Sequence, residues 1–165
     1  MDFREAYNAL KAALVADAWI VANSVPVIDG IHANMAIDDL AREYATTFSE
    51  NNFTIVIEHP GAATLEDAER IGFLVSNFAI IMVENPAYRS GVSPIDPLAA
   101  VFEVASAAFG KPVESGGRNV FKLAQKFYSY AGEARSHLYH RFNYTIGIQL
   151  PAKTLSATRA QPQAV

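Results

Sequence analysis

The sequence predicts an α+β fold in which helices pack on a four-stranded, mainly antiparallel sheet. The chain has 165 residues, about the size of one domain with its own hydrophobic core. Hydrophobic residues make up 51% of it and charged residues 18%, which excludes a disordered chain or a coiled coil. The predicted elements follow the order helix, helix, strand, strand, helix, strand, strand. This order lacks the βαβ alternation of a Rossmann-type fold and favours antiparallel pairing.

Two helices are predicted at the start of the chain. Apolar side chains recur with helical spacing in residues 2–19, at Phe3, Tyr7, Leu10 and Leu14. Asp2 is a candidate cap for this helix. The breakers Val25-Pro26 and Asp29-Gly30 follow, and a second, shorter helix is predicted from Ile37, Leu40, Tyr44 and Phe48. It is expected to end near Asn51-Asn52.

The period then changes to that of strands. Residues 53–58 alternate in the manner of a strand and stop at His59-Pro60-Gly61. Residues 71–84 are apolar on both faces, so this strand is expected in the middle of the sheet, covered on both sides. A helix is one expected cover, and a neighbouring subunit is a candidate for the other.

A third helix is predicted for residues 96–109. Asp96 is placed to accept the first free N–H groups, Pro97 suits the first helical position, and Gly110 and Pro112 end the helix. One apolar stripe is expected to pack on a sheet face, and it consists of Leu98, Val101, Phe102, Ala105 and Phe109.

The last two strands are predicted as a hairpin. Residues 120–131 form its first strand, Gly132-Glu133 its turn and residues 136–150 its second strand. One face of the second strand is apolar apart from His140, and it carries Leu138, Phe142, Tyr144, Ile146, Ile148 and Leu150. Residues 1–150 are therefore expected to form a single domain, and residues 151–165 a flexible C-terminal tail.

No sequence pattern indicates catalysis or a cofactor. The chain has no cysteine, which excludes a thiolate metal site or a cysteine nucleophile. His137 and His140 are three residues apart on a strand and are expected on opposite faces, so they do not form a ligand pair. No nucleotide-binding or hydrolase motif occurs. The expectation is a protein that is not an enzyme, with no catalytic, cofactor or metal-binding residues.

Charge and hydropathy limit the partners. The net charge is −4 and no apolar run is long enough to cross a bilayer, so neither sequence-specific nucleic-acid binding nor membrane insertion is expected. Residues 1–110 hold 5 basic and 15 acidic side chains, whereas residues 111–165 hold 8 basic and 2 acidic ones. This asymmetry is read either as one mixed surface or as complementary patches that meet between copies.

Candidate interface residues follow from the second reading. The acidic ones lie in the loop 59–70, which is expected to contact other chains as the tail does, and the basic ones lie in the final hairpin. They are Glu66, Asp67, Glu69, Lys122, Lys126, Arg135 and Arg141.

The order of elements resembles the tail terminator proteins of long-tailed bacteriophages. The likeness covers residues 1–150: a leading helix, a long loop, the strands 53–58 and 71–84, the helix 96–109, and a final strand HLYHRFNYTIGIQL. The chain is longer than compact members in residues 21–52 and 61–70.

The resemblance implies a virion protein of the tail and neck, made in the host bacterial cytoplasm. It implies a homo-oligomeric ring, a hexamer, that caps the tail tube protein, stops tail growth and offers a surface to head-completion or connector proteins. Two alternatives stay open: another neck or tail-completion protein, and a small α+β ligand-binding or hydrolytic domain.

Overall fold

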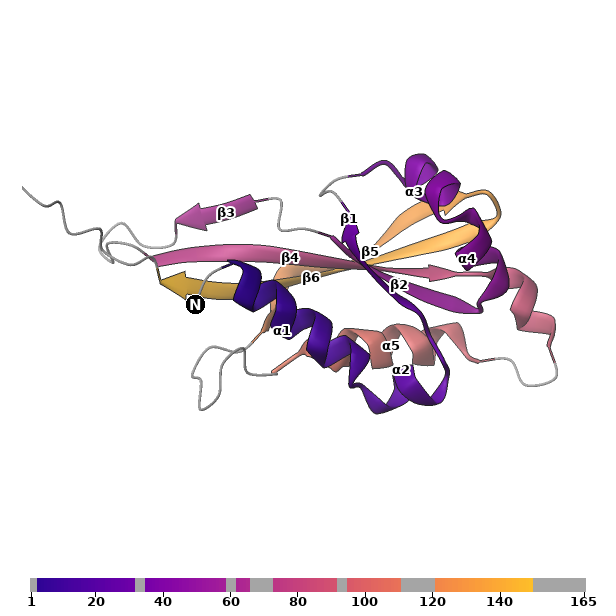
Figure 1. Ribbon diagram of the computed structural model, residues 1–165, viewed down its shortest axis with the longest axis horizontal. Helices are drawn as coiled ribbons and strands as arrows, with labels where there is room; N and C mark the ends of the chain where they lie inside the picture. Colours follow the sequence, from indigo (N-terminus) through magenta and orange to yellow (C-terminus); the bar gives the residue numbers. More distant parts are fainter. Residues whose placement is uncertain are drawn as a thin grey trace, which may run out of the picture.

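The computed structural model describes residues 3–31, 35–58, 62–65, 73–91, 95–110 and 121–149. These residues form a mixed sheet with helices on both faces, so the α+β class is confirmed (Figure 1). Five strands lie in the order β1–β2–β4–β6–β5, and a short sixth strand, β3, pairs with β4. The strands are β1 (Val27–Ile31), β2 (Phe53–Glu58), β3 (Ala62–Leu65), β4 (Phe73–Glu84), β5 (Lys122–Ala134) and β6 (His137–Gln149).

The sheet has more strands than the sequence predicts, and it is mixed. β2, β4, β5 and β6 match the four predicted strands and pair antiparallel, whereas β1 and β3 were not predicted. β1 pairs parallel with β2 through Val27 and Ile55, so the segment from β1 to β2 forms a βαβ crossover. The prediction failed for β1 because Asp29-Gly30, a typical turn pair, lies inside this short edge strand.

Each predicted N-terminal helix divides into two. The first gives α1 (Phe3–Val15) and α2 (Ala18–Ala22), separated where the Asp17 carboxylate accepts hydrogen bonds from the N–H groups of Trp19 and Ile20. The second gives α3 (Ile37–Glu43) and α4 (Ala45–Glu50), which meet at Tyr44. The proposed Asp2 cap lies outside the described residues.

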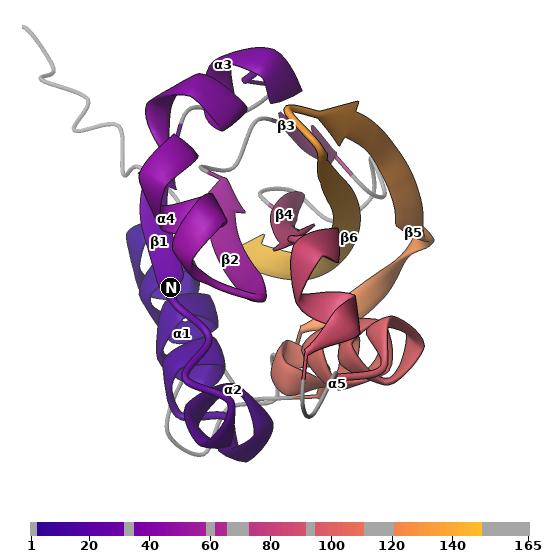
Figure 2. The same cartoon turned by 90° about the vertical axis from the view of Figure 1, so that its right-hand side faces the viewer.

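Helices cover both faces of the sheet centre (Figure 2). On the first face, α1, α2 and α5 (Pro97–Ala108) pack on the sheet, with Leu10, Val104 and Phe142 in the same core cluster. On the second face, Leu40 and Phe48 of α3 and α4 cover Ile81, Val83 and Tyr139. The second cover of β4 along Ile81 and Val83 is therefore a helix pair of the same chain, and the candidate subunit cover is not needed there.

The helix α5 begins as predicted but presents a different side to the sheet. Asp96 caps it by accepting the N–H of Leu98 at 3.0 Å. The buried residues are the small Ala100, Val104, Ala107 and Ala108, whereas Leu98, Phe102 and Phe109 of the predicted stripe are 78%, 71% and 53% exposed. α5 is apolar nearly all round, so the pattern alone does not choose a side. The small side lets the helix approach closely enough for the Tyr144 hydroxyl to donate to the Ala105 carbonyl at 2.8 Å.

The final hairpin turns three residues later than predicted. Arg135 and Ser136 have φ values of 49° and 65° and form the two-residue turn between β5 and β6. Gly132, which was predicted as part of the turn, lies within β5 next to a break in register, with φ 129°. The predicted facing of β6 is confirmed at Phe142, Tyr144 and Ile146, which are buried on the first face.

Candidate functional site

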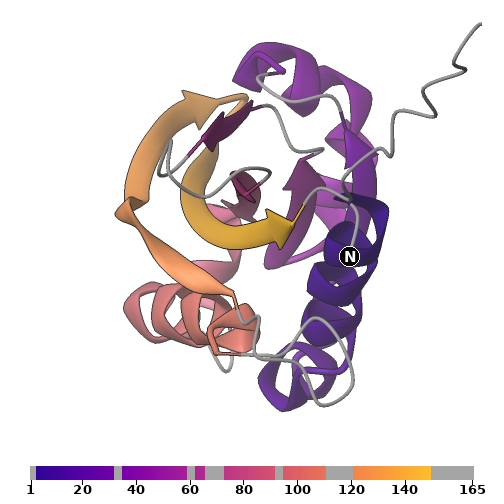
Figure 3. The ribbon, with the colours of Figure 1, turned by 90° about the vertical axis from the view of Figure 1, so that its left-hand side faces the viewer.

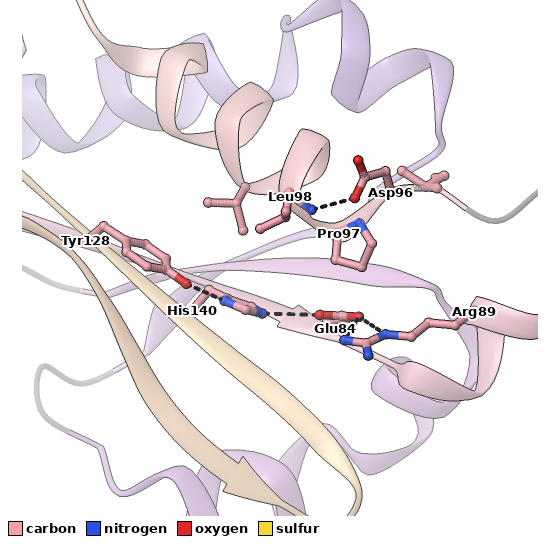
Figure 4. A pocket seen from close by; sticks show the side chains of 9 residues that line it. Glu84, Arg89, Asp96, Pro97, Leu98, Tyr128 and His140 are labelled. Carbon is pink, nitrogen blue, oxygen red and sulfur yellow. Dashed lines mark hydrogen bonds and ion pairs between the residues drawn. The ribbon is translucent and has the colours of Figure 1, made fainter.

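A cavity of about 610 Å³ lies between the first turn of α5 and the strands β4, β5 and β6 (Figure 4). One wall is apolar and comes from the start of α5, with Ile95, Pro97, Leu98 and Val101. Asp96 also lines the cavity and is exposed to solvent. The other side carries four polar side chains, Tyr128, His140, Glu84 and Arg89, which the figure shows in a row.

The four side chains form one hydrogen-bonded row. Arg89 Nε donates to Glu84 Oε1 at 2.7 Å, and His140 Nε2 lies 3.2 Å from Glu84 Oε2. Tyr128 Oη lies 3.0 Å from His140 Nδ1. Glu84 is 1% exposed, and the neighbouring guanidinium compensates for burying its charge. Both ring nitrogens of His140 are therefore within hydrogen-bond distance of a partner, Nε2 of the Glu84 carboxylate and Nδ1 of the Tyr128 hydroxyl.

Tyr128 is not activated as a nucleophile in this row. Burial raises the pKa of Tyr128, and the nearby charge of Glu84 raises it further. The hydroxyl therefore stays protonated at neutral pH, and an activated nucleophile needs the opposite shift. Apolar walls around a few oriented polar groups are typical of a binding site.

Six large apolar or aromatic side chains of α5, its C-terminal cap and β5 are exposed, and we call them the α5–β5 apolar face; two of them, Leu98 and Tyr128, also line the cavity. The face consists of Leu98, Phe102, Phe109, Leu123, Tyr128 and Tyr130, each at least 39% exposed. The end of α5 is joined to the start of β5 by the Gly110 N–H, which donates to the Phe121 carbonyl at 2.9 Å, and Figure 3 shows the helix beside this part of the strand. Leu123 and Tyr128 pair with Tyr144 and Phe142, so they project toward the side of the sheet that α5 covers.

The sequence-predicted basic residues are only partly brought together. Lys122 and Lys126 are exposed on β5, while the exposed Arg135 lies in the turn at the far end of that strand. Arg141 donates from Nη1 and Nη2 to the two carboxylate oxygens of Glu58, at 3.0 and 2.5 Å. Glu58 is 1% exposed, and burial raises its pKa although Arg141 opposes the shift. Arg141 therefore neutralises a buried group of its own chain.

The acidic interface candidates Glu66, Asp67 and Glu69 lie outside the described residues, as do residues 151–165. The predicted placement of His137 and His140 on opposite faces of the sheet is confirmed: His137 Nε2 lies 3.1 Å from the Phe48 carbonyl on the second face, whereas His140 is in the cavity. Within the described residues, no three potential metal ligands lie together, and no helix is long and apolar enough to cross a membrane.

Sequence reasoning missed the polar row of the cavity. Its available signals were weak: Glu84 ends an apolar strand, and His140 interrupts the apolar face of the last strand. The row itself depends on strand register, which places His140 opposite Met82 on one side and Tyr130 on the other. No protein-family model matches the chain, and no curated protein matches its sequence.

Proposed function

We propose that the protein is a structural component of the bacteriophage neck, a tail terminator with a tail-terminator-like fold. In this role it forms a homohexameric ring on the tail tube protein, stops tail growth and provides the surface to which head-completion or connector proteins bind. It is then a virion protein made in the bacterial cytoplasm.

The observation that carries this proposal is the α5–β5 apolar face. With roughly 150–250 Å² for each aromatic side chain and somewhat less for leucine, its exposed fractions correspond to about 500–800 Å² in total. The largest apolar patch of a typical monomer is about 300–600 Å², whereas a standard interface covers about 800 Å² on each partner. The exposed area therefore supports a protein that works in an assembly.

The edge of the sheet gives the same indication. β5 is the last strand in the sheet order, so its outer backbone groups have no strand partner among the described residues. It is 13 residues long, and most of its side chains are exposed. Long open edges are unfavourable in proteins that act alone, and assembly is one way to protect them.

Assembly and tube binding test the proposal. Sedimentation velocity and native mass spectrometry of the full chain should show a hexamer in solution or on added tail tubes, and negative-stain images should show rings at tube ends. Phe102→Lys should reduce ring formation at least tenfold, while the exposed Thr46→Lys on α4 should leave it unchanged. A chain that stays monomeric at high concentration and ignores tubes would rule the proposal out.

A small ligand-binding or hydrolytic domain is the second candidate, favoured by the row Tyr128–His140–Glu84–Arg89 in the cavity. It predicts a monomer or dimer that binds small molecules or hydrolyses activated esters. His140→Gln should abolish such binding or turnover. If the unchanged protein shows neither in a ligand screen and an ester assay, this candidate is excluded.

A further inference from the structure

A second apolar surface lies on α1 and α2, and we call it the α1–α2 corner. Its members are all apolar and exposed: Ala12, Val15, Ala16, Ala18, Val21 and Ala22. Val15 and Val21 are 50% and 61% exposed. Figure 2 shows α2 at an outer corner of the molecule, away from β5.

The composition of this corner is unusual for a solvated helix surface. The inner sides of the two helices already supply the core through Leu10, Leu14 and Ile20. A surface helix normally carries polar residues on its outer side. The only charged residue between Ala12 and Ala22 is Asp17, whose carboxylate is occupied in capping α2.

The molecule thus carries two different uncharged surfaces on separate elements. A contact between two different surfaces repeats from copy to copy and closes into a ring when the rotation allows it. We propose that the α1–α2 corner of one copy packs against the α5–β5 apolar face of the next copy and covers its cavity. This inference rests on the proposed ring and names the surfaces that build it.

A second copy is the occupant that the observations favour. The α5–β5 apolar face, at about 500–800 Å² from its exposed fractions, approaches the area of about 800 Å² that one partner contributes to a standard interface. The chain itself supplies an apolar surface to cover it.

The cavity is compatible with an apolar occupant. The buried members of the row, Glu84 and His140, have their hydrogen-bond partners within it, so covering them requires no polar group from the neighbour, whereas half-exposed Arg89 keeps its remaining N–H groups in solvent at the rim. The methyl groups of Val21 can then pack on Pro97, Leu98 and Val101 without leaving that row unpaired.

The natural absence of cysteine makes a cross-linking test specific. Two full-length variants, Val21→Cys and Phe102→Cys, are given different mass tags and mixed under conditions in which the unchanged protein forms rings. A flexible bis-maleimide is then added. Covalent dimers should form between unlike variants at least tenfold more often than between like variants. The pair Val21→Cys and Thr46→Cys is the control and should give only background cross-linking.

The outcomes separate this inference from the proposed function. Thermal unfolding first checks that each variant retains the stability of the unchanged protein. If rings form and Phe102→Cys links mainly to itself, or Val21→Cys and Phe102→Cys do not link, the assigned surfaces are wrong and the ring stands. If the unchanged protein forms no ring alone or on tubes, the proposed function fails first.

Discussion

Phe142 is one of the large, fully buried side chains of the core on the first face of the sheet. It is completely buried on β6, and its ring centroid lies 5.5 Å from that of Tyr128. Phe142→Ala should lower the free energy of unfolding by about 3–5 kcal/mol, because it removes the transfer energy of the ring and leaves a cavity. Urea unfolding followed by circular dichroism measures this change. Unfolding at the same urea concentration as the unchanged protein would show that the core is assigned wrongly.

Tyr139 carries a buried hydroxyl group that destabilises the fold. It is fully buried, and its hydroxyl has no hydrogen-bond partner among the described residues. Tyr139→Phe should therefore raise the free energy of unfolding at neutral pH by about 1 kcal/mol. The control is Tyr144→Phe, which removes the hydrogen bond to Ala105 and should lower that free energy by about 1 kcal/mol. A loss of stability in Tyr139→Phe would mean that the hydroxyl has a partner.

Tyr139 also gives a prediction at alkaline pH. Burial raises the pKa of Tyr139 to about 12, from an ordinary value of 10.0. The folded state thus holds this proton more tightly than the unfolded state, so its contribution is complete below pH 10 and is lost as the pH rises toward 12. Urea unfolding from about pH 9 to about pH 12, which spans this loss, should show a smaller decline for Tyr139→Phe than for the unchanged protein. Equal declines would contradict the shift.

At the scale of elements, the turn of the final hairpin contains a residue that is not the most stable choice for its backbone conformation. Ser136 has a φ of 65°, a conformation that glycine adopts without steric strain. Ser136→Gly should raise the free energy of unfolding by up to about 1 kcal/mol, because relief of strain exceeds the added chain entropy. Ser129→Gly, an exposed position within β5, should lower it by about 0.5–1 kcal/mol. Thermal unfolding compares the two, and destabilisation by both would argue against this turn.

The elements also show what the sequence could predict. β2, β4 and β6 were found because their side chains alternate or stay apolar over the whole strand, which follows from burial of one or both faces. β1 was missed because Asp29-Gly30, a typical turn pair, lies inside this short strand, so its pairing with β2 leaves no strand pattern in the sequence. The prediction of which side of α5 packs on the sheet was wrong because both sides of the helix are apolar. Only the close fit on the sheet selects the side with the smaller residues.

The candidate site was predicted less well than the fold. The exposed lysines Lys122 and Lys126 were identified from charge alone, which needs no tertiary information. The row of Glu84, His140 and Tyr128 joins three strands, and a shift of one residue in either register would separate it. The apolar faces were missed because an exposed apolar residue looks like a core residue in a sequence.

At the scale of the whole molecule, charge should assist assembly. The excess of acidic residues in positions 1–110 and of basic residues in positions 111–165 predicts attraction between copies. Association should become slower as ionic strength rises from about 0.01 M to 0.15 M, because salt shortens the range of that attraction from about 30 to 8 Å. Light scattering after dilution into each salt concentration measures the rate. An association rate that does not depend on salt would show that electrostatic attraction between copies does not assist assembly.

Charge reversal tests which basic residues provide this attraction between copies. The double variant Lys122→Glu and Lys126→Glu should weaken assembly while the fold is retained, since both side chains are exposed. Arg4→Glu, an equally exposed reversal in α1, is the control and should have a smaller effect. Arg141 is unsuitable for this test because its reversal would place a second negative charge beside buried Glu58. Equal assembly of the double variant and the control would contradict the assignment.

The β5–β6 hairpin has a kinetic consequence. Its strands are joined by two residues, whereas the neighbouring pair β4–β6 brings together residues as distant in the chain as Phe73 and Gln149. Closing the short connection loses far less chain entropy, so the hairpin should form early in folding and supply the edge onto which β4 then docks. A substitution that improves the turn at Ser136 should therefore accelerate folding in stopped-flow experiments and leave the unfolding rate nearly unchanged.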